Sequence, residues 1–334
     1  MECAKLAKIL DRLLKIPLAE PWDNVGLLIQ PSTSSPISRI CLTNDLTEPV
    51  LDEVISLGAN FVISYHPPIF RPLKRLVQNS WKERVVVKCL ENKIAVYSPH
   101  TALDSVSGGI NDWLLSPFDL QIKVPIKRRQ FEEKPATVAT LFGRELQAYC
   151  IKNQIPPLNV DIPSSYDRLA EVVAGDGAES FSSALSADAI NLLPEEGSGR
   201  VALLNDGYTI QDAIEAYKRL FDTSTLKVAL GYGKQLDSPV TSVAVCAGSG
   251  GSMFAQEPMA YVADLLVTGE ASHHEQLDIV ARGATIITAG HSVSERGYLS
   301  QRLRPWLASE LKKESMEPIP IDVASTDAEP GVIL

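Results

Sequence analysis

Short strand-like segments alternate with helical segments in the first third of the chain. The segments 39–46, 60–65 and 94–98 are apolar and rich in β-branched residues, as buried strands are. Apolar side chains recur with helical spacing between them, at 50–59 and 80–93. Parallel strands need a crossover connection, which is usually a helix, so this order predicts a mostly parallel sheet.

The last third of the chain repeats this alternation. Its expected strands are 199–205, 226–231, 240–248, 263–270 and 284–290. Its expected helices are 209–221, 274–282 and a helix after Ser294. The sequence therefore predicts an α/β fold with two βα-rich halves, residues 1–116 and 199–334, which form a mostly parallel or mixed sheet core.

The segment between the two halves, residues 117–198, has a different composition. It is rich in Pro, Gly and Ser and has little periodicity, which is typical of loops. A strand and a helix are expected at 137–146, but no residue of the segment suggests a chemical role. We interpret 117–198 as an insert between the two halves.

Charge and composition exclude several classes of protein. A formal net charge of -10 argues against a nucleic-acid-binding surface, which normally gathers Lys and Arg. No run of 18 apolar residues is present, so no membrane-spanning helix is expected. The five cysteines are scattered without CxxC spacing, as in a reducing compartment, and a cytoplasmic location is expected. The amphipathic helix expected within 1–16 carries Lys and Arg, and a mitochondrial signal is its minority interpretation.

All five histidines lie in three short regions of the sequence. The first region combines YHPPIF (65–70) with SPHTALD (98–104), the second is GEASHHEQL (269–277), and the third is GHSVSERG (290–297). Each motif directly follows a predicted strand. Because ligands of open α/β sheets bind at the carboxyl ends of the strands, the motifs can converge on one site.

The polar residues of these motifs are of the types that bind transition metals. Imidazoles and carboxylates suit Zn, Fe, Mn or Ni, and they are supplied by His66, His100, Asp104, His291 and Glu295. His291 and Glu295 are four residues apart where a helix begins, so both can face the same side. A single loop histidine is more often a hydrogen-bonding residue, and a lone Asp after a strand is more often a helix cap. Three motifs at strand ends favour a metal site over that interpretation.

Two further motifs leave alternatives open. His273 and His274 could line the same cleft or, with Glu270, belong to a helix-capping arrangement. The glycine-rich CAGSGGSM (246–253) could bind an anion with its backbone N–H groups, or it could simply allow a tight turn from strand to helix. It lacks the GK[ST] ending of a P-loop.

Together these motifs resemble one protein family. PWDNVGLLI (21–29), YHPPIF, SPHTALD followed by GGIND (108–112), CAGSGGSM, TGE with SHHEQL, and GHSVSERG are similar, in this order, to the NIF-three-like family in its eukaryotic form. Bacterial members of that family carry the provisional name GTP cyclohydrolase I type 2 homologues. The resemblance covers both halves and leaves the insert out.

The resemblance implies a dinuclear centre that holds two divalent metal ions, Zn, Fe or Mn. Its ligands are a His-His pair after the second strand, the Asp of an HTxLD motif, and the His and Glu of a GHxxxE motif. The matching residues here are His66, Asp104, His291 and Glu295. The first His of the pair is Tyr65 in this chain, a weak or lost ligand position. His100 then becomes the candidate catalytic residue, and the alternative is that it only hydrogen-bonds a backbone carbonyl.

Two functions follow from this resemblance. The first is a metal-dependent hydrolase that acts on a nucleotide-like or heterocyclic substrate. The second is a non-catalytic adaptor linked to transcriptional co-regulation, which would be found in the nucleus as well as the cytoplasm. A metal chaperone or storage protein is a third interpretation. The resemblance also implies a homo-oligomer, either a dimer or a ring.

Overall fold

The strands of the first third form a five-stranded sheet in the order β1-β4-β3-β2-β13. The computed structural model describes residues 2–32, 35–128, 196–314 and 318–331. The strands of this sheet are β1 (Gly26–Ile29), β2 (Ile40–Thr43), β3 (Phe61–Ser64), β4 (Ala95–Ser98) and β13 (Ile321–Val323). The strands β4, β3, β2 and β13 pair in parallel, and β1 joins β4 antiparallel.

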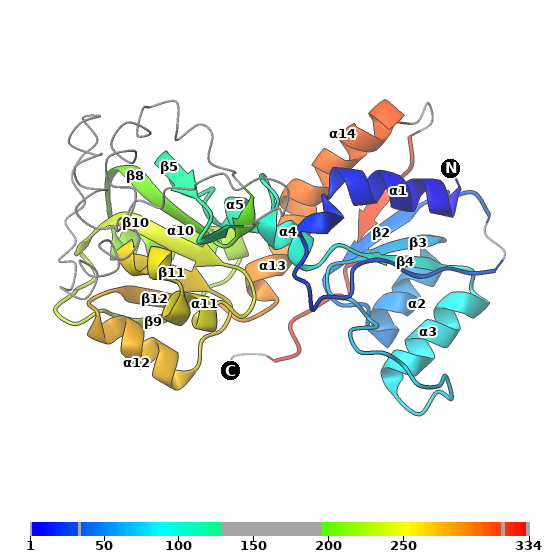
Figure 1. The fold of residues 1–334 in the computed structure, drawn as a ribbon, viewed down its shortest axis with the longest axis horizontal. Coiled ribbons are helices and arrows are strands. Elements are labelled where there is room, and N and C mark those ends of the chain that lie inside the picture. The colour runs from blue at the N-terminus through cyan, green and yellow to red at the C-terminus, as the bar shows by residue number, and fades with distance from the viewer. Residues whose placement is uncertain (1, 33–34, 129–195, 315–317, 332–334) are drawn as a thin grey trace, which may run out of the picture.

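Helices cover both faces of this first sheet, which explains why β2, β3 and β4 are buried along their whole length and mostly apolar. Side chains of α1 (Cys3–Leu13) and α14 (Arg304–Glu314) pack on one face. Those of α2 (Glu48–Ser56) and α3 (Trp81–Glu91) pack on the other face. Figure 1 shows these two helix layers above and below the sheet.

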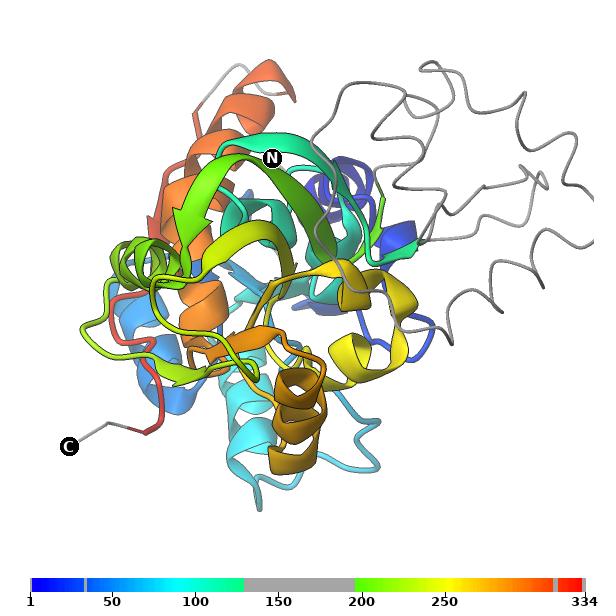
Figure 2. The same ribbon diagram turned by 90° about the vertical axis from the view of Figure 1, so that its left-hand side faces the viewer.

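The last third forms a six-stranded mixed sheet in the order β5-β8-β10-β11-β12-β9. Its strands are β5 (Leu120–Val124), β8 (Arg200–Thr209), β9 (Lys227–Ala229), β10 (Pro239–Cys246), β11 (Leu265–Thr268) and β12 (Thr285–Thr288). The helix α10 (Ile210–Phe221) packs on one face, and α11 (Gly251–Gln256) and α12 (His273–Ala281) pack on the other (Figure 2).

The two sheets lie side by side and share a core (Figure 1). The short helices α4 (Thr101–Ser105), α5 (Ile110–Leu114) and α13 (Val293–Tyr298) lie between them, and a π-helix (Leu299–Leu303) joins α13 to α14. A two-stranded sheet, β6 (Lys127–Arg128) with β7 (Gly197–Ser198), and the 3-10 turns Ile16–Leu18 and Pro258–Val262 complete the described elements.

A buried arginine ties the helices between the sheets to the second sheet. Arg200 is only 1% exposed, and its guanidinium donates to the carbonyls of Gly199 at 2.7 Å and Val106 at 3.1 Å. It also donates to Asp112 Oδ1 at 3.1 Å. Because this buried cation is both paired and hydrogen-bonded, it holds the α4–α5 segment against the start of β8.

The predicted α/β class is confirmed. The structure adds five short strands that we did not predict, β1, β5, β6, β7 and β13. Of these, β5 comes from the first residues of the expected insert, and β13 returns from the end of the chain to the first sheet. The strand and helix expected at 137–146 lie outside the described residues, and the boundaries 1–116, 117–198 and 199–334 stay predictions. Across the described ranges, no helix is long and apolar enough to span a membrane.

Glu53 of α2 anchors the segment that follows β13. Its carboxylate accepts hydrogen bonds from the backbone N–H groups of Ser325 and Thr326, both at 2.8 Å, and from their hydroxyls at 2.7 and 2.6 Å. Burial alone would raise the pKa of Glu53, but these hydrogen bonds outweigh it and lower the pKa to about 2. The carboxylate form is therefore stabilised by folding.

We expect Glu53→Gln to lower the free energy of unfolding by about 1 kcal/mol at neutral pH, since this partly exposed group loses charge-assisted hydrogen bonds. A depressed folded-state pKa contributes stability above the unfolded-state pKa, and that stability is lost as pH falls towards about 2. The difference between variant and wild type in urea unfolding should therefore shrink in acid. Glu91→Gln, at an exposed position of α3, is the control. A difference that does not change with pH would contradict this account.

Candidate metal centre

The first residue of the candidate site follows directly on β3. The backbone N–H of Tyr65 donates to the Thr43 carbonyl, and that of His66 donates to the Asn44 carbonyl, each at 2.9 Å. The parallel pairing of β3 with β2 therefore continues beyond the two strand ends. This pairing positions His66 at the carboxyl edge of the first sheet, where it faces the second half of the chain.

The other two residues come from the second half. His291 follows β12, and Glu295 lies in the first turn of α13. Ser294 donates to the His291 carbonyl at 2.7 Å, which closes the turn that leads into the helix. The spacing of four residues brings both side chains to one side, as their sequence separation indicated.

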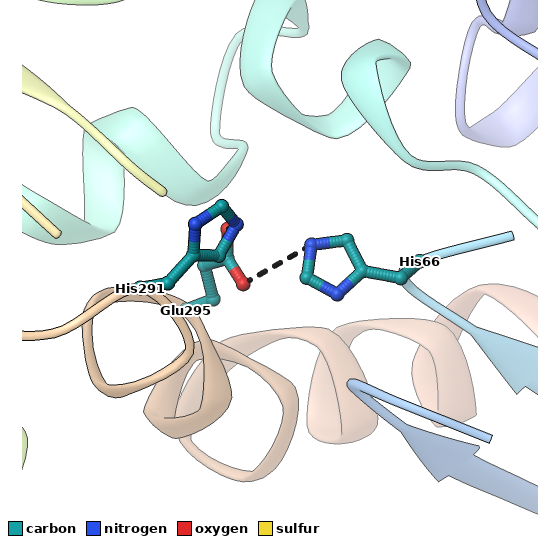
Figure 3. Close-up of side chains that lie close together, drawn as sticks. All are labelled: His66, His291 and Glu295. Atoms are coloured by element: carbon teal, nitrogen blue, oxygen red, sulfur yellow. Dashed lines mark ion pairs between the residues drawn. The ribbon is translucent and has the colours of Figure 1, made fainter. Parts of the chain in front are cut away.

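His66, His291 and Glu295 meet between the two sheets (Figure 3). His66 Nε2 lies 3.4 Å from Glu295 Oε2, and His291 Nε2 lies 3.4 Å from Glu295 Oε1. One ligand atom from each residue can be chosen so that all three lie within 4.8 Å of one another. The two imidazoles thus face the two oxygens of one carboxylate, and that carboxylate is buried, with only 2% of the side chain exposed.

Two further carboxylates hold the opposite nitrogens of the imidazoles. His66 Nδ1 is 2.9 Å from Asp45 Oδ1, and His291 Nδ1 is 2.9 Å from Glu270 Oε2. An ionised carboxylate only accepts hydrogen bonds, so each Nδ1 carries a proton, and each Nε2 is the ring nitrogen left to bind a metal ion. Metal-binding histidines are oriented in this way by carboxylate partners.

Asn44 completes the surroundings of Glu295. Its side-chain N–H donates to Glu295 Oε2 at 3.0 Å. Its buried Oδ1 has no hydrogen-bond partner in the described part of the chain. The electrostatics favour a cation, because Asp45 and Glu295 raise the pKa of His66 to about 10 against the opposing effect of burial.

These residues fit a divalent metal ion. Two imidazole nitrogens and one carboxylate are the ligands of many zinc and iron sites, and three protein ligands leave a coordination position open. The backbone around the cluster also fits this arrangement. Gly248, in the CAGSGGSM turn, has a φ of +63°, and a Cβ there would lie 2.5 Å from Glu295 Oε1. The tight-turn interpretation of that motif therefore accounts for Gly248.

Asp104 is not among the three clustered residues, and it is hydrogen-bonded to Tyr65. The Tyr65 hydroxyl donates to Asp104 Oδ1 at 2.5 Å. Burial raises the pKa of Asp104 to about 6. Burial and the neighbouring Asp104 also raise the pKa of Tyr65 well above its usual value, so the phenol keeps its proton. A protonated phenol is a poor metal ligand, and Tyr65 occupies one oxygen of Asp104.

His100 is held by Asp23, as His66 and His291 are held by their own carboxylate partners. His100 Nδ1 is 2.7 Å from Asp23 Oδ1, and the Thr101 hydroxyl donates to Asp23 Oδ2 at 2.6 Å. The His100 backbone has φ 34° and ψ −119°, an unfavourable conformation for a residue with a Cβ. The His100 ring centroid lies 5.4 Å from that of His66. His100 therefore borders the cluster, and Asp23 contacts its Nδ1 rather than its Nε2.

His273 and His274 are exposed at the start of α12 and are not among the three clustered residues. The cap of that helix is formed by Ser272 and Glu275, and Glu270 contacts His291 instead. Sequence reasoning did not single out Asn44 or Asp45 and did not assign Glu270 to His291. The available signal was their position, because each directly follows a strand, as the histidine motifs do.

We expect Asp45→Ala to weaken metal binding by about 10- to 100-fold, because His66 would lose the partner that orients its ring. The dissociation constant for Zn²⁺ can be measured by competition with a chromophoric chelator. Asp52→Ala, a surface aspartate of α2, is the matched control. Equal affinities in the two variants would show that Asp45 does not support the site.

The fold and site together define a class, an α/β protein with a candidate metal centre between two sheets. Within that class, the chain belongs to the Duf34/NIF3 (NGG1p interacting factor 3) family, whose model matches residues 1–328. The resemblance noted in the sequence is thereby confirmed.

Relatives of this family are similar over most of their length. NIF3-like protein 1 of Homo sapiens is 34% identical over 369 residues, covering 99% of this chain and 92% of the human protein. NGG1-interacting factor 3 of Saccharomyces cerevisiae is 30% identical, covering 86% and 84%. A Bacillus cereus protein related to NIF3 has the same fold, with a TM-score of 0.70, 21% identity, and coverage of 99% of this chain and 98% of that one.

Proposed function

We propose that this protein is a metal-dependent hydrolase that acts on a nucleotide-like or heterocyclic substrate. The observation that carries this proposal is the arrangement of His66, His291 and Glu295. Both imidazole Nε2 atoms face a buried carboxylate, while both Nδ1 atoms are held by other carboxylates. A structural role would not require two histidines oriented in this way.

The residues around the cluster have separable roles in this proposal. When bound, a Zn, Fe or Mn ion supplies Lewis acidity that polarises the substrate and activates water. His66, His291 and Glu295 would hold the ion, and Asp45 and Glu270 orient the two rings. His100, whose Nδ1 is fixed by Asp23, would accept or donate a proton at Nε2.

The number of ions depends on Asp104. The family resemblance implies two ions, and the second would take Asp104 as a ligand. Asp104 Oδ1 accepts a hydrogen bond from Tyr65, which stands where the family has a histidine. A second ion therefore has to compete with this hydrogen bond. We propose that the first ion binds among His66, His291 and Glu295 and that the second position is weak.

Metal content and turnover test the proposed function. Elemental mass spectrometry of the purified protein should find metal that is lost in His66→Ala. The loaded protein is then incubated with purine and pyrimidine nucleotides, and opening of a ring is followed by ultraviolet absorbance. Turnover that disappears in His100→Ala while metal content is retained would support the assigned role of His100. Absence of metal after supplementation would contradict the proposal.

A second candidate function is a non-catalytic adaptor in transcriptional regulation. The observation that favours it is the name of the yeast relative, NGG1-interacting factor 3, together with tyrosine at a family ligand position. An adaptor would bind metal without turnover and would be found in the nucleus as well as the cytoplasm. For both candidate functions we expect a homo-oligomer, a dimer or a ring, which sedimentation would detect.

A further inference from the structure

We infer that Trp22 and Phe70 form a binding surface for the planar ring of an uncharged heterocycle beside the candidate metal centre. This inference rests on the proposed function and names the part of the substrate that the chain itself would recognise. Trp22 is 62% exposed and Phe70 is 41% exposed. Large aromatic side chains exposed together beside a polar cluster are typical of ligand-binding surfaces.

The two rings belong to one aromatic cluster with His100. The ring centroids of Trp22 and Phe70 are 6.0 Å apart, and each is 6.2 Å from that of His100, with interplanar angles between 69° and 84°. The three rings thus contact one another edge to face, the geometry that aromatic pairs prefer. Since His100 also adjoins His66, the cluster extends from the surface to the candidate metal ligands.

The backbone that carries these rings is held in place by the next residues. Asn24 donates from its side chain to the Ile69 carbonyl at 2.5 Å, which ties the Trp22 loop to the Phe70 loop. Asp23 contacts both His100 and Thr101. The two rings therefore lie on loops fixed to each other and to the site, so little entropy would be lost on binding.

The charges near Trp22 and Phe70 indicate that the bound ligand would be uncharged. Carboxylates surround the site at Asp23, Asp45, Asp104, Glu270 and Glu295. A bound metal ion would offset only part of this negative charge. The affinity for a ligand would therefore come from the aromatic rings of the protein rather than from basic side chains. An uncharged heterocycle such as a nucleobase can stack on Trp22 or Phe70 and place a ring substituent near His100.

The test uses uncharged nucleosides and the full chain. Dissociation constants of adenosine, guanosine and cytidine are measured by calorimetry on zinc-supplemented protein, with ribose as the ligand that lacks a base. Trp22→Ala should raise the dissociation constant of the best nucleoside at least about 10-fold, and Trp22→Phe, which keeps an aromatic ring, by less than about 3-fold. Trp306→Ala removes a tryptophan that is 40% exposed on α14, and it should leave binding unchanged.

The metal content of each sample separates this inference from the proposed function. If the wild type holds no zinc but binds a nucleoside, and Trp22→Ala loses that binding, the proposed function is contradicted while the inferred ring-binding surface is supported. The inference is overturned if the zinc-loaded wild type binds no nucleoside, if ribose binds equally well, or if Trp22→Ala binds like wild type. It is also overturned if Trp22→Ala dissociates an oligomer in sedimentation, because the rings would then contact a second copy of the chain.

Discussion

Glu295→Gln should weaken metal binding by more than about 100-fold, which exceeds the loss typical of an outer-sphere partner. Glu295 is the residue that both imidazoles face, with each of its oxygens 3.4 Å from one Nε2. The glutamine keeps the shape of the side chain and can still contact Asn44, but it removes the negative charge and offers the ion an amide. Anionic oxygen is the stronger ligand for Zn, Fe and Mn.

Metal content after dialysis against a weak chelator, followed by zinc titration, measures this effect. Glu215→Gln, the same substitution at a partly exposed position of α10, is the matched control. Circular dichroism would check that the variant is folded, because Glu295 is buried. If a folded Glu295→Gln protein keeps the metal of the wild type, the ion lies elsewhere and the assignment of the centre is wrong.

Tyr65→His should raise the metal content from one ion per chain to two. The substitution restores the imidazole of the family motif and removes the hydroxyl that donates to Asp104. Asp104 would then be free to share a second ion with the new histidine. Because Tyr65 is buried and its pKa is raised well above the usual value, the wild-type phenol cannot supply an anionic oxygen near neutral pH.

Two further variants identify the cause of that increase. Tyr65→Phe releases Asp104 without adding a nitrogen, so it should still hold one ion. Adding Asp104→Asn to Tyr65→His should return the count to one. Elemental mass spectrometry and zinc titration give the counts. Two ions in the wild type would instead mean that Asp104 binds metal despite Tyr65, and one ion in Tyr65→His would mean that Asp104 cannot take part.

Much of the fold followed from local patterns. The inner strands β2, β3 and β4 are buried on both faces, so they appear in the sequence as mostly apolar segments without alternating polar residues. The strands β1 and β13 do not have this signature. They are edge strands of four and three residues with partly exposed side chains, and β13 pairs with β2 from the far end of the chain. Pairing between such distant segments leaves no local pattern.

The candidate site shows the same division. The sequence by itself indicated that the histidine motifs follow strands and that His291 and Glu295 can face one side where a helix begins, because these are properties of short segments. Only the tertiary structure decided which residues meet. Packing of the two sheets around a common core brings His66 to Glu295, aligns Asp45 and Glu270 with the two imidazoles, and joins Tyr65 to Asp104. Such contacts form between side chains of separate elements, so their distances depend on how those elements pack rather than on spacing along the chain.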